Sequence, residues 1–320
     1  MKKLMMVLMM SVLLAAVPVL GGPLVKSRVS GSANWVAHVD IERFNSTQIG
    51  RLIREELRNQ GMEENLTNFA NVFSFHPLDD VRNVTIYGQD QKPEKAVVLI
   101  EAKFDKERLL TVLRFNPSYE ETKYGDIVIH SWVDEKKQDP NDSNVGRMYG
   151  CFYNDELVVM GAGLEAVKQA VDVLNGSAEN AASDVFNQAS LNAKGAFFQV
   201  AANNVGEVVG EEPEAAALKQ TSELSLAIGE FENNFYVDLD LKAKSEEAAQ
   251  AISKILDGII AFATLAGEEQ PKLAELAKKV ELSCVQNTIQ IRFKASSETV
   301  FSFLKEQWKI KQEKAAQEQS

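Results

Sequence analysis

Cysteine and histidine are scarce in this chain of 320 residues, which contains two cysteines and three histidines. Two cysteines permit at most one disulfide. The chain also lacks the His-Glu-x-x-His motif of zinc enzymes and the Gly-x-Ser-x-Gly elbow of serine hydrolases. Proline and glycine are not enriched, so long disordered stretches are not expected away from the two ends. These absences remove the clearest catalytic signatures, and the sequence does not reveal a biochemical activity.

Basic residues are fewer than acidic ones, 34 against 46, which gives a net charge of −12. Without residues 1–33, which hold four basic residues and no acid, the charge falls to −16. Such an acidic protein repels nucleic acid and anionic lipid surfaces. No nucleic-acid partner is therefore expected. The partner is expected to be a protein, a small molecule or a glycan of the cell envelope.

The N-terminus has the pattern of a secretory signal. Lys2 and Lys3 precede the apolar stretch Leu4–Leu20, and two glycines follow it. We expect export to the periplasm or the extracellular space, with residues 1–33 acting as signal and linker. The alternative is a retained membrane anchor, because the length of the apolar stretch is at the lower limit for spanning a bilayer. No other stretch is expected to span a membrane.

Two segments of the chain match at a constant offset, which indicates an internal duplication. Each segment is typical of a strand, a turn at an asparagine, a second strand and the start of a helix. The equivalence of the two cysteines suggests a disulfide near a pseudo-twofold axis, although buried free thiols explain the same pattern. The matched residues are Cys151, Asn154, Ala162, Glu165 and Val167 in one segment, and Cys284, Asn287, Ala295, Glu298 and Val300 in the other.

The order of strand and helix patterns predicts an α+β fold made of two tandem repeats. Each repeat is predicted to be a mainly antiparallel sheet with helices packed on one face, in the order β-α-β-β-α-β-β-α. The second repeat lacks an obvious counterpart of the strand predicted at Ile127–Val133. The predicted divisions are a first repeat at 34–175, a linker at 176–194, a second repeat at 195–310 and a polar tail at 311–320.

A binding or scaffolding role without catalysis is the leading hypothesis, for an exported protein of the bacterial envelope. Duplication creates a cleft between similar modules, and clefts are common ligand sites. An exposed sheet face is the other expected location. Neither a cofactor nor a metal is expected, because the few possible ligands do not form a short-range metal motif. Polar or aromatic side chains on predicted strands are the candidate cleft residues, namely Trp35, His38, Asp40, His130 and Trp132.

Two other functional classes remain open. The first is an exported hydrolase, which would use His38 and Asp40 or the pair Asp238 and Asp240, because carboxylate pairs serve acid–base catalysis. The second is an interaction module held to a membrane by an uncleaved Leu4–Leu20 helix.

A glycine motif after the strand predicted near residue 160 resembles a dinucleotide-binding turn. It runs Gly161-Ala-Gly163-Leu-Glu-Ala166 and opens a predicted helix. The stretch after that helix is polar and lacks the second parallel strand of a nucleotide-binding unit. We therefore interpret the motif as a strand-to-helix turn that needs a glycine with positive φ.

Overall fold

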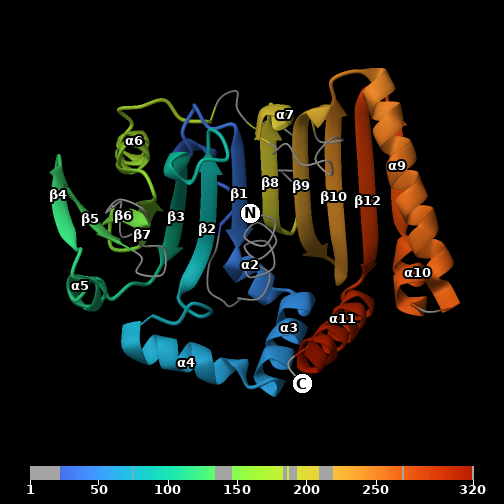
Figure 1. The fold of residues 1–320 in the computed structure, drawn as a ribbon, viewed down its shortest axis with the longest axis horizontal. Helices are drawn as coiled ribbons and strands as arrows, with labels where there is room; N and C mark the ends of the chain where they lie inside the picture. Colours follow the sequence, from blue (N-terminus) through green and yellow to red (C-terminus); the bar gives the residue numbers. More distant parts are fainter. Residues whose placement is uncertain are drawn as a thin grey trace.

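The computed structural model describes residues 22–73, 75–133, 146–182, 186, 193–208, 219–268 and 270–318. These residues form an α+β fold around one twelve-stranded sheet with the order β11-β12-β10-β9-β8-β1-β2-β3-β7-β6-β5-β4 (Figure 1). All neighbouring strands pair antiparallel. The strands are β1 Trp35–Asp40, β2 Val81–Gly88, β3 Ala96–Ala102, β4 Glu120–Tyr124, β5 Ile127–Val133, β6 Arg147–Phe152, β7 Leu157–Gly161, β8 Ala196–Asn203, β9 Thr221–Phe231, β10 Asn234–Ala243, β11 Val280–Val285 and β12 Thr288–Ser296.

Side-chain caps begin several of the helices, because an oxygen just before the helix accepts a hydrogen bond from its first turn. Asp105 caps α5 and Ser245 caps α9. The α-helices are α2 Ile41–Ser46, α3 Gln48–Asn59, α4 Met62–Phe73, α5 Lys106–Arg114, α6 Leu164–Leu174, α7 Val205–Val208, α9 Glu246–Leu265, α10 Pro271–Ala277 and α11 Ser297–Glu318. Short 3₁₀ helices are η1 Lys26–Arg28, η2 Pro93–Lys95 and η5 Ala266–Glu268.

The two predicted sheets are one sheet, joined where β1 pairs with β8. Outward from β1 the order is β2, β3, β7, β6, and outward from β8 it is β9, β10, β12, β11. The two sides therefore place their strands in the same order. Strands β5 and β4 extend only the first side, in agreement with the missing counterpart noted in the sequence. Common ancestry of the two halves stays a prediction.

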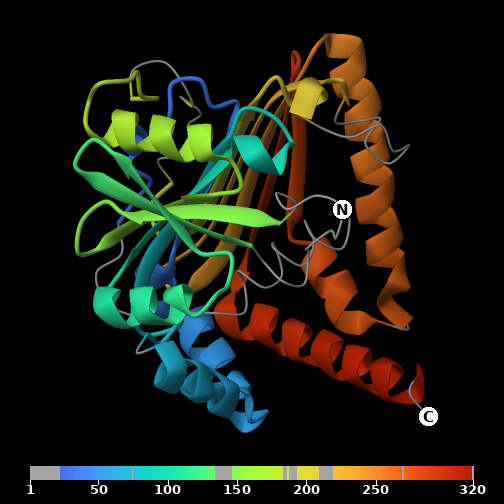
Figure 2. The same ribbon diagram turned by 60° about the vertical axis from the view of Figure 1, so that its left-hand side comes forward.

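Helices cover both faces of the sheet, so the prediction of helices on one face is wrong. On one face α6 packs Val167 and Ala170 against β3 and β7. On the other, α9 packs Ala249 and Ile252 against β10 and β12. Figure 2 shows α6 and α9 on opposite sides of the sheet. The reason is that apolar residues gather on a different face at each side of the sheet, such as Leu99 and Val159 under α6 and Leu241 and Ile289 under α9, and an apolar face needs cover.

The cysteines are free, and the predicted disulfide between Cys151 and Cys284 is wrong. Eight strands separate β6 from β11 in the sheet, which amounts to about 43 Å. Cys151 lies opposite Val159, eight positions later, whereas Cys284 lies opposite Ile289, five positions later. The two spacings differ by three residues, an odd number, and side chains alternate between faces along a strand. The two thiols therefore point to opposite faces, although their hairpins occupy the same place in the strand order. Cys151 packs with α6 and Cys284 with α9.

Three other predictions differ from the structure or lie outside it. The charged strand β4 was not predicted, because four of its five residues are exposed and polar. Helix α11 continues to Glu318, through most of the predicted polar tail. Residues 1–21 of the predicted signal and linker at 1–33, and much of the predicted linker at 176–194, lie outside the described residues. Of that linker, Phe186 is fully buried in the core beside α6.

Candidate functional site

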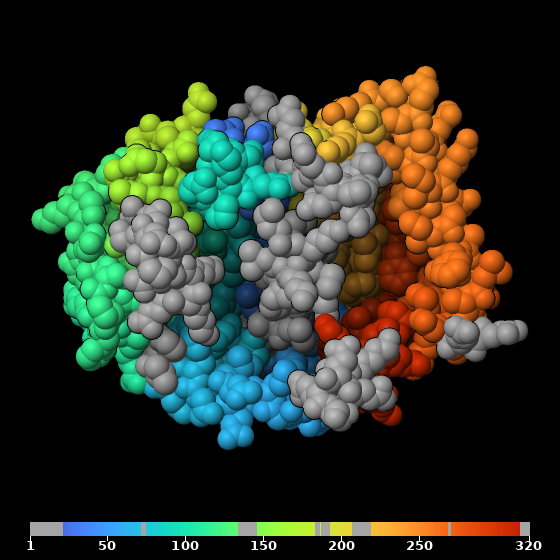
Figure 3. Space-filling view, in the orientation of Figure 1, coloured from blue at the N-terminus to red at the C-terminus, as the bar shows by residue number. Residues whose placement is uncertain are grey.

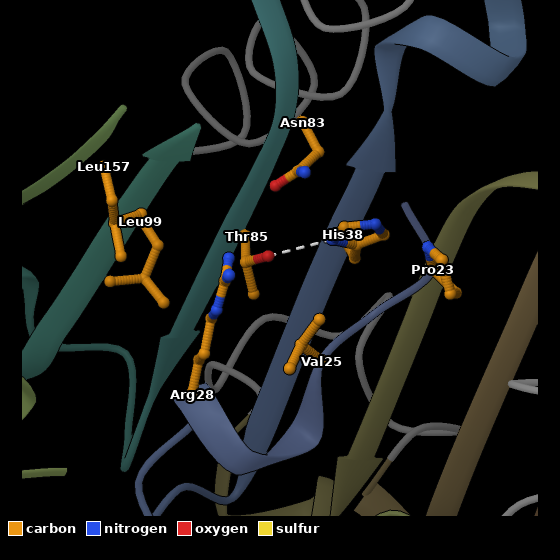
Figure 4. Close-up of a pocket in the computed structure, with 8 residues that line it drawn as sticks. All are labelled: Pro23, Val25, Arg28, His38, Asn83, Thr85, Leu99 and Leu157. Carbon is orange, nitrogen blue, oxygen red and sulfur yellow. Dashed lines mark hydrogen bonds between the residues drawn. The ribbon is translucent and has the colours of Figure 1, made fainter. Parts of the chain in front are cut away.

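His38 lies at the centre of a buried polar cluster on the face that carries α6 (Figure 4). Its Nε2 donates to the carbonyl of Gly22 at 3.0 Å, so its Nδ1 accepts from the hydroxyl of Thr85 at 2.8 Å. The side chain is 2% exposed. Burial lowers the pKa of His38 to about 4, because the charged imidazolium would lose its hydration. His38 is therefore neutral at physiological pH, with both ring nitrogens partnered.

The recess beside His38 is small and closed by an ion pair. Arg28 donates to Glu101 at 3.0 Å, and Asn83 donates to the same carboxylate at 2.8 Å. Asp40, on the same face of β1, accepts from the backbone of Arg43 at 2.8 Å and so caps α2. Burial raises the pKa of Asp40. The hydrogen bonds of His38 and Asp40 are satisfied within the fold.

The five predicted cleft residues do not share a cleft, which corrects that prediction. His38 and Asp40 point to the α6 face, whereas Trp35 alternates with them and points to the other face. His130 and Trp132 also point to that other face, but from β5. Four strands separate β1 from β5, so the two groups are about 24 Å apart. A metal site of His38, Asp40 and His130 is excluded by the same separation.

Trp35 and His130 also have structural partners. The Trp35 indole donates to the carbonyl of Asp90 at 2.9 Å, and its ring covers Gly88 so closely that a Cβ there would lie within 3 Å of it. His130 donates to the hydroxyl of Tyr119 at 2.7 Å, which in turn donates to Glu121 at 2.6 Å. Burial lowers the pKa of His130.

Asp238 and Asp240 share a strand face on β10, and Arg292 on β12 lies against both. Its guanidinium is 3.6 Å from Asp238 and 2.5 Å from Asp240. Two strands separate β10 from β1, so the pair is about 14 Å from His38 in the sheet. The two residue pairs of the hydrolase hypothesis, His38 with Asp40 and Asp238 with Asp240, therefore lie at separate places in the sheet. Among the described residues, no three metal-ligating side chains are close enough to hold an ion.

The glycines near residue 160 are explained by close packing. Gly163 has an extended backbone, with φ of −119°, so a positive φ is not the reason for glycine. A Cβ on Gly163 would lie 2.0 Å from the carbonyl oxygen of Glu94 in η2, and one on Gly161 would lie 2.8 Å from that of Ala96. The backbone of η2 thus lies against the turn that a nucleotide phosphate would need to approach.

We predict that Gly163→Ala destabilises the protein by about 2 kcal/mol, because η2 must shift to remove the clash. Gly258→Ala is the matched control, since nothing lies within 4 Å of its added Cβ and it is in helix α9. Alanine is the better helix former there, so the control stabilises by about 0.5–1 kcal/mol. Urea unfolding of both variants measures the two free energies. Equal effects would contradict the packing explanation.

The face opposite His38 carries a continuous line of aliphatic side chains across nine strands, which we call the apolar row. Its members lie opposite one another in register, and each is half-buried. Eight strand spacings make it about 38 Å long. The row consists of Met160, Val98, Ile86, Ala37, Val200, Leu226, Leu239, Ile291 and Leu282.

The adjacent row on the other face has the opposite character in the second half of the sheet. It runs from His38 through Gln199 and Ala227 to Asp238 and Arg292. An apolar face normally needs cover, yet in the described part of the chain no helix crosses the middle of the apolar row (Figure 1). Helix α9 lies over its β11 end. Figure 3 shows the β2–β3 and β10–β12 regions recessed below the surrounding helices.

The sequence contained the signal for this surface, in the alternation of β9 and β10. Leu224, Leu226 and Ile228 alternate with polar or small residues, as do Val237 and Leu239. The residues proposed from the sequence as cleft residues were polar or aromatic, and none belongs to the apolar row. What the alternation does not show is that no helix of the described residues crosses the middle of this face, because that depends on where α9 and α11 pack.

No family model matches the chain, and no curated protein matches it. Among solved structures, crystal form III of TP0453 is similar with a TM-score of 0.48 and 8% identity, over 88% of this chain and 98% of that one. Crystal form I of TP0453 gives 0.47 and 8% identity, over 87% and 95%. Crystal form IV gives 0.42 and 8% identity, over 88% and 97%. TM-scores below 0.5 leave the likeness too weak to support a statement about the function of this chain.

Proposed function

We propose that this protein is an exported envelope protein that binds the acyl chains of a lipid on the apolar row and catalyses no reaction. The observation that carries the proposal is the row itself, nine half-buried aliphatic residues in register across both halves of the sheet. Burial of apolar surface contributes about 25 cal/mol per Å². A ligand without polar atoms therefore gains most from this surface.

The chemistry of the row favours an acyl chain over an extended peptide or a glycan. A peptide strand gains its affinity by pairing with a free sheet edge. All strands of the row except β11 are already paired on both sides, so a peptide lying across them would bury backbone groups without partners. A glycan needs hydrogen-bonding side chains, and the row offers none. An acyl chain has no such requirement.

The wider prediction of a duplicated module fits this proposal. Corresponding strands on the two sides of the β1–β8 junction contribute to one row, so two short apolar faces make one long one. Export remains part of the proposal and is supported by the pattern of Lys2, Lys3 and Leu4–Leu20. We also propose that duplication, rather than chance, explains the shared strand order.

Binding is tested with a fluorescent fatty acid, dansylaminoundecanoic acid, and protein purified from the envelope fraction. N-terminal sequencing of the same sample decides whether Leu4–Leu20 is cleaved or retained. We expect saturable binding by the wild type. Two polar amides in the row, Ile86→Gln with Leu226→Gln, should weaken binding at least about 10-fold, because they place groups that need hydrogen bonds against the acyl chain.

Asp238→Asn is the matched control, because it alters the opposite face of the sheet on β10, the strand next to that of Leu226. It should leave probe affinity unchanged. Far-UV circular dichroism checks that each variant is folded. If the double variant does not fold, Leu226→Ala replaces it in the binding measurement. Absence of probe binding by folded wild type, or equal binding by all variants, would overturn the proposal. Loss of binding in Asp238→Asn alone would instead favour a site on the polar face.

A further inference from the structure

Helix α9 exposes large apolar side chains along its C-terminal half, beside the side that packs on the sheet. Ile255, Ile259, Phe262 and Leu265 are 57%, 60%, 77% and 83% exposed. They follow one another at intervals of four, three and three residues, so they form one stripe along the helix, which we call the α9 stripe. Figure 1 shows α9 at the edge of the molecule, and Figure 3 shows it forming the right-hand rim.

The neighbouring side of α9 holds the helix to the fold. Ala249 and Ile252 are buried against β10, β11 and β12, with Leu256 packed beside them. The α9 stripe is therefore presented on a fixed helix. Glu246–Leu265 is also long and apolar enough to cross a membrane by length and composition, although little of it is buried in the fold. This corrects the prediction that only Leu4–Leu20 has that character, which overlooked that Lys254 and Asp257 are the sole charges after Glu247.

We infer that the α9 stripe inserts into the surface of a lipid bilayer. A helix that lies in the interface places its apolar side chains at the boundary of headgroups and acyl chains while its other side stays polar or covered. Here the covered side is packed on the sheet. The inference stands without the proposed acyl-chain binding, because it depends only on α9.

The extent of the stripe argues against a second copy of the chain as its occupant. A stable protein interface buries about 800 Å² on each partner and involves about 20–30 residues a side. The α9 stripe offers four large side chains, and its other exposed members are small, such as Ala251 and Gly258. Insertion into a bilayer needs no minimum interface area. Each apolar side chain that leaves water adds its own binding free energy, about 1.5–3 kcal/mol when fully buried.

Charge selects the kind of bilayer. The chain carries a net charge of −12, and the flanks of the stripe hold one cation, Lys254, and one anion, Asp257. No basic cluster accompanies the stripe, whereas anionic membranes are recognised by several lysines or arginines. We therefore commit to an uncharged, zwitterionic surface. Binding should change little with salt and should weaken as anionic lipid is added.

The test is flotation of the purified protein with phosphatidylcholine vesicles. We expect the wild type to float with the vesicles and the double variant Ile259→Gln with Phe262→Gln to partition at least about 10-fold less, because two side chains no longer gain from leaving water. Lys254→Gln is the matched control on the same helix and should float like the wild type. Equal flotation of the double variant, or loss of flotation in the control alone, would overturn the inference.

A second readout keeps the test valid if an N-terminal anchor is retained. Tryptophan fluorescence of Phe262→Trp should be quenched by brominated phosphatidylcholine beyond the quenching seen in the wild type, whereas Gln250→Trp, outside the stripe, should show no such increase. Sedimentation completes the design. A wild-type dimer that the double variant dissociates would show that the stripe binds a second copy, and the bilayer inference would fail even though the acyl-chain proposal would be unaffected.

Discussion

Acidification from pH 7 to pH 4 is expected to destabilise the protein by about 3 kcal/mol more than it destabilises a His38→Gln variant. In the fold the pKa of His38 is lowered from 6.5 to about 4, mainly by burial. Below pH 6.5 the unfolded chain therefore binds a proton that the folded chain does not. The contribution of neutral His38 is complete above pH 6.5 and is lost as the pH falls towards 4.

Glutamine is the appropriate replacement because it stays neutral at every pH and its amide can donate to the carbonyl of Gly22, as Nε2 does. Urea unfolding of both proteins at pH 7, 6, 5 and 4 measures the difference. Burial also raises the pKa of Asp40, but Asp40 is present in both proteins, so the comparison removes most of its contribution. Parallel curves over this range would mean that His38 is hydrated in solution and that the packing of Gly22 over it is wrong.

Local patterns in the sequence predicted most elements of this fold. The strand predicted at Ile127–Val133 is β5, with the same bounds. A local turn also favours the hairpin between β9 and β10, where Glu232 and Asn233 both have positive φ. Caps were predictable for the same reason, because Ser245 needs only the first turn of α9 as its partner. These features depend on interactions over a few residues, which the sequence displays directly.

Long-range features were missed because nothing local specifies them. The joining of the two halves requires β1 to pair with β8, about 160 residues later. No local pattern in either strand indicates which strand it pairs with. The same holds for the site. The sequence suggested His38 as a ligand-binding residue on a strand. In the fold both of its ring nitrogens form hydrogen bonds, one with Gly22 and one with Thr85. The apolar row became visible only when the register of nine strands was known.

Glu230 links the two halves of the molecule. It lies on β9, yet its carboxylate accepts from the backbone amides of Gln48 at 2.7 Å and Ile49 at 2.8 Å, at the start of α3. The hydroxyl of Ser297, where α11 begins, donates to it at 2.5 Å. The next amide of α3, that of Gly50, is capped by Thr47. One carboxylate thus completes the N-terminus of a helix from the other half of the chain.

Glu230→Ala is expected to destabilise the protein by about 3 kcal/mol, because it leaves two amides and a hydroxyl without partners and removes a negative charge from the positive end of α3. Glu223→Ala is the matched control. Glu223 lies on the same strand and pairs with Lys242 at 2.6 Å, but both side chains are well exposed, so its loss costs about 1 kcal/mol or less. Urea unfolding followed by circular dichroism measures both values.

The comparison separates a tie between the halves from an ordinary surface contact. If the two variants lose the same free energy, α3 is not held by Glu230. If Glu230→Ala instead unfolds in two steps, the β1–β8 pairing alone does not make the sheet one cooperative unit. We expect a single step, because the apolar row and the buried strands beneath it continue across that junction without a break, and because Lys305 on α11 still pairs with Glu56 on α3 at 2.6 Å.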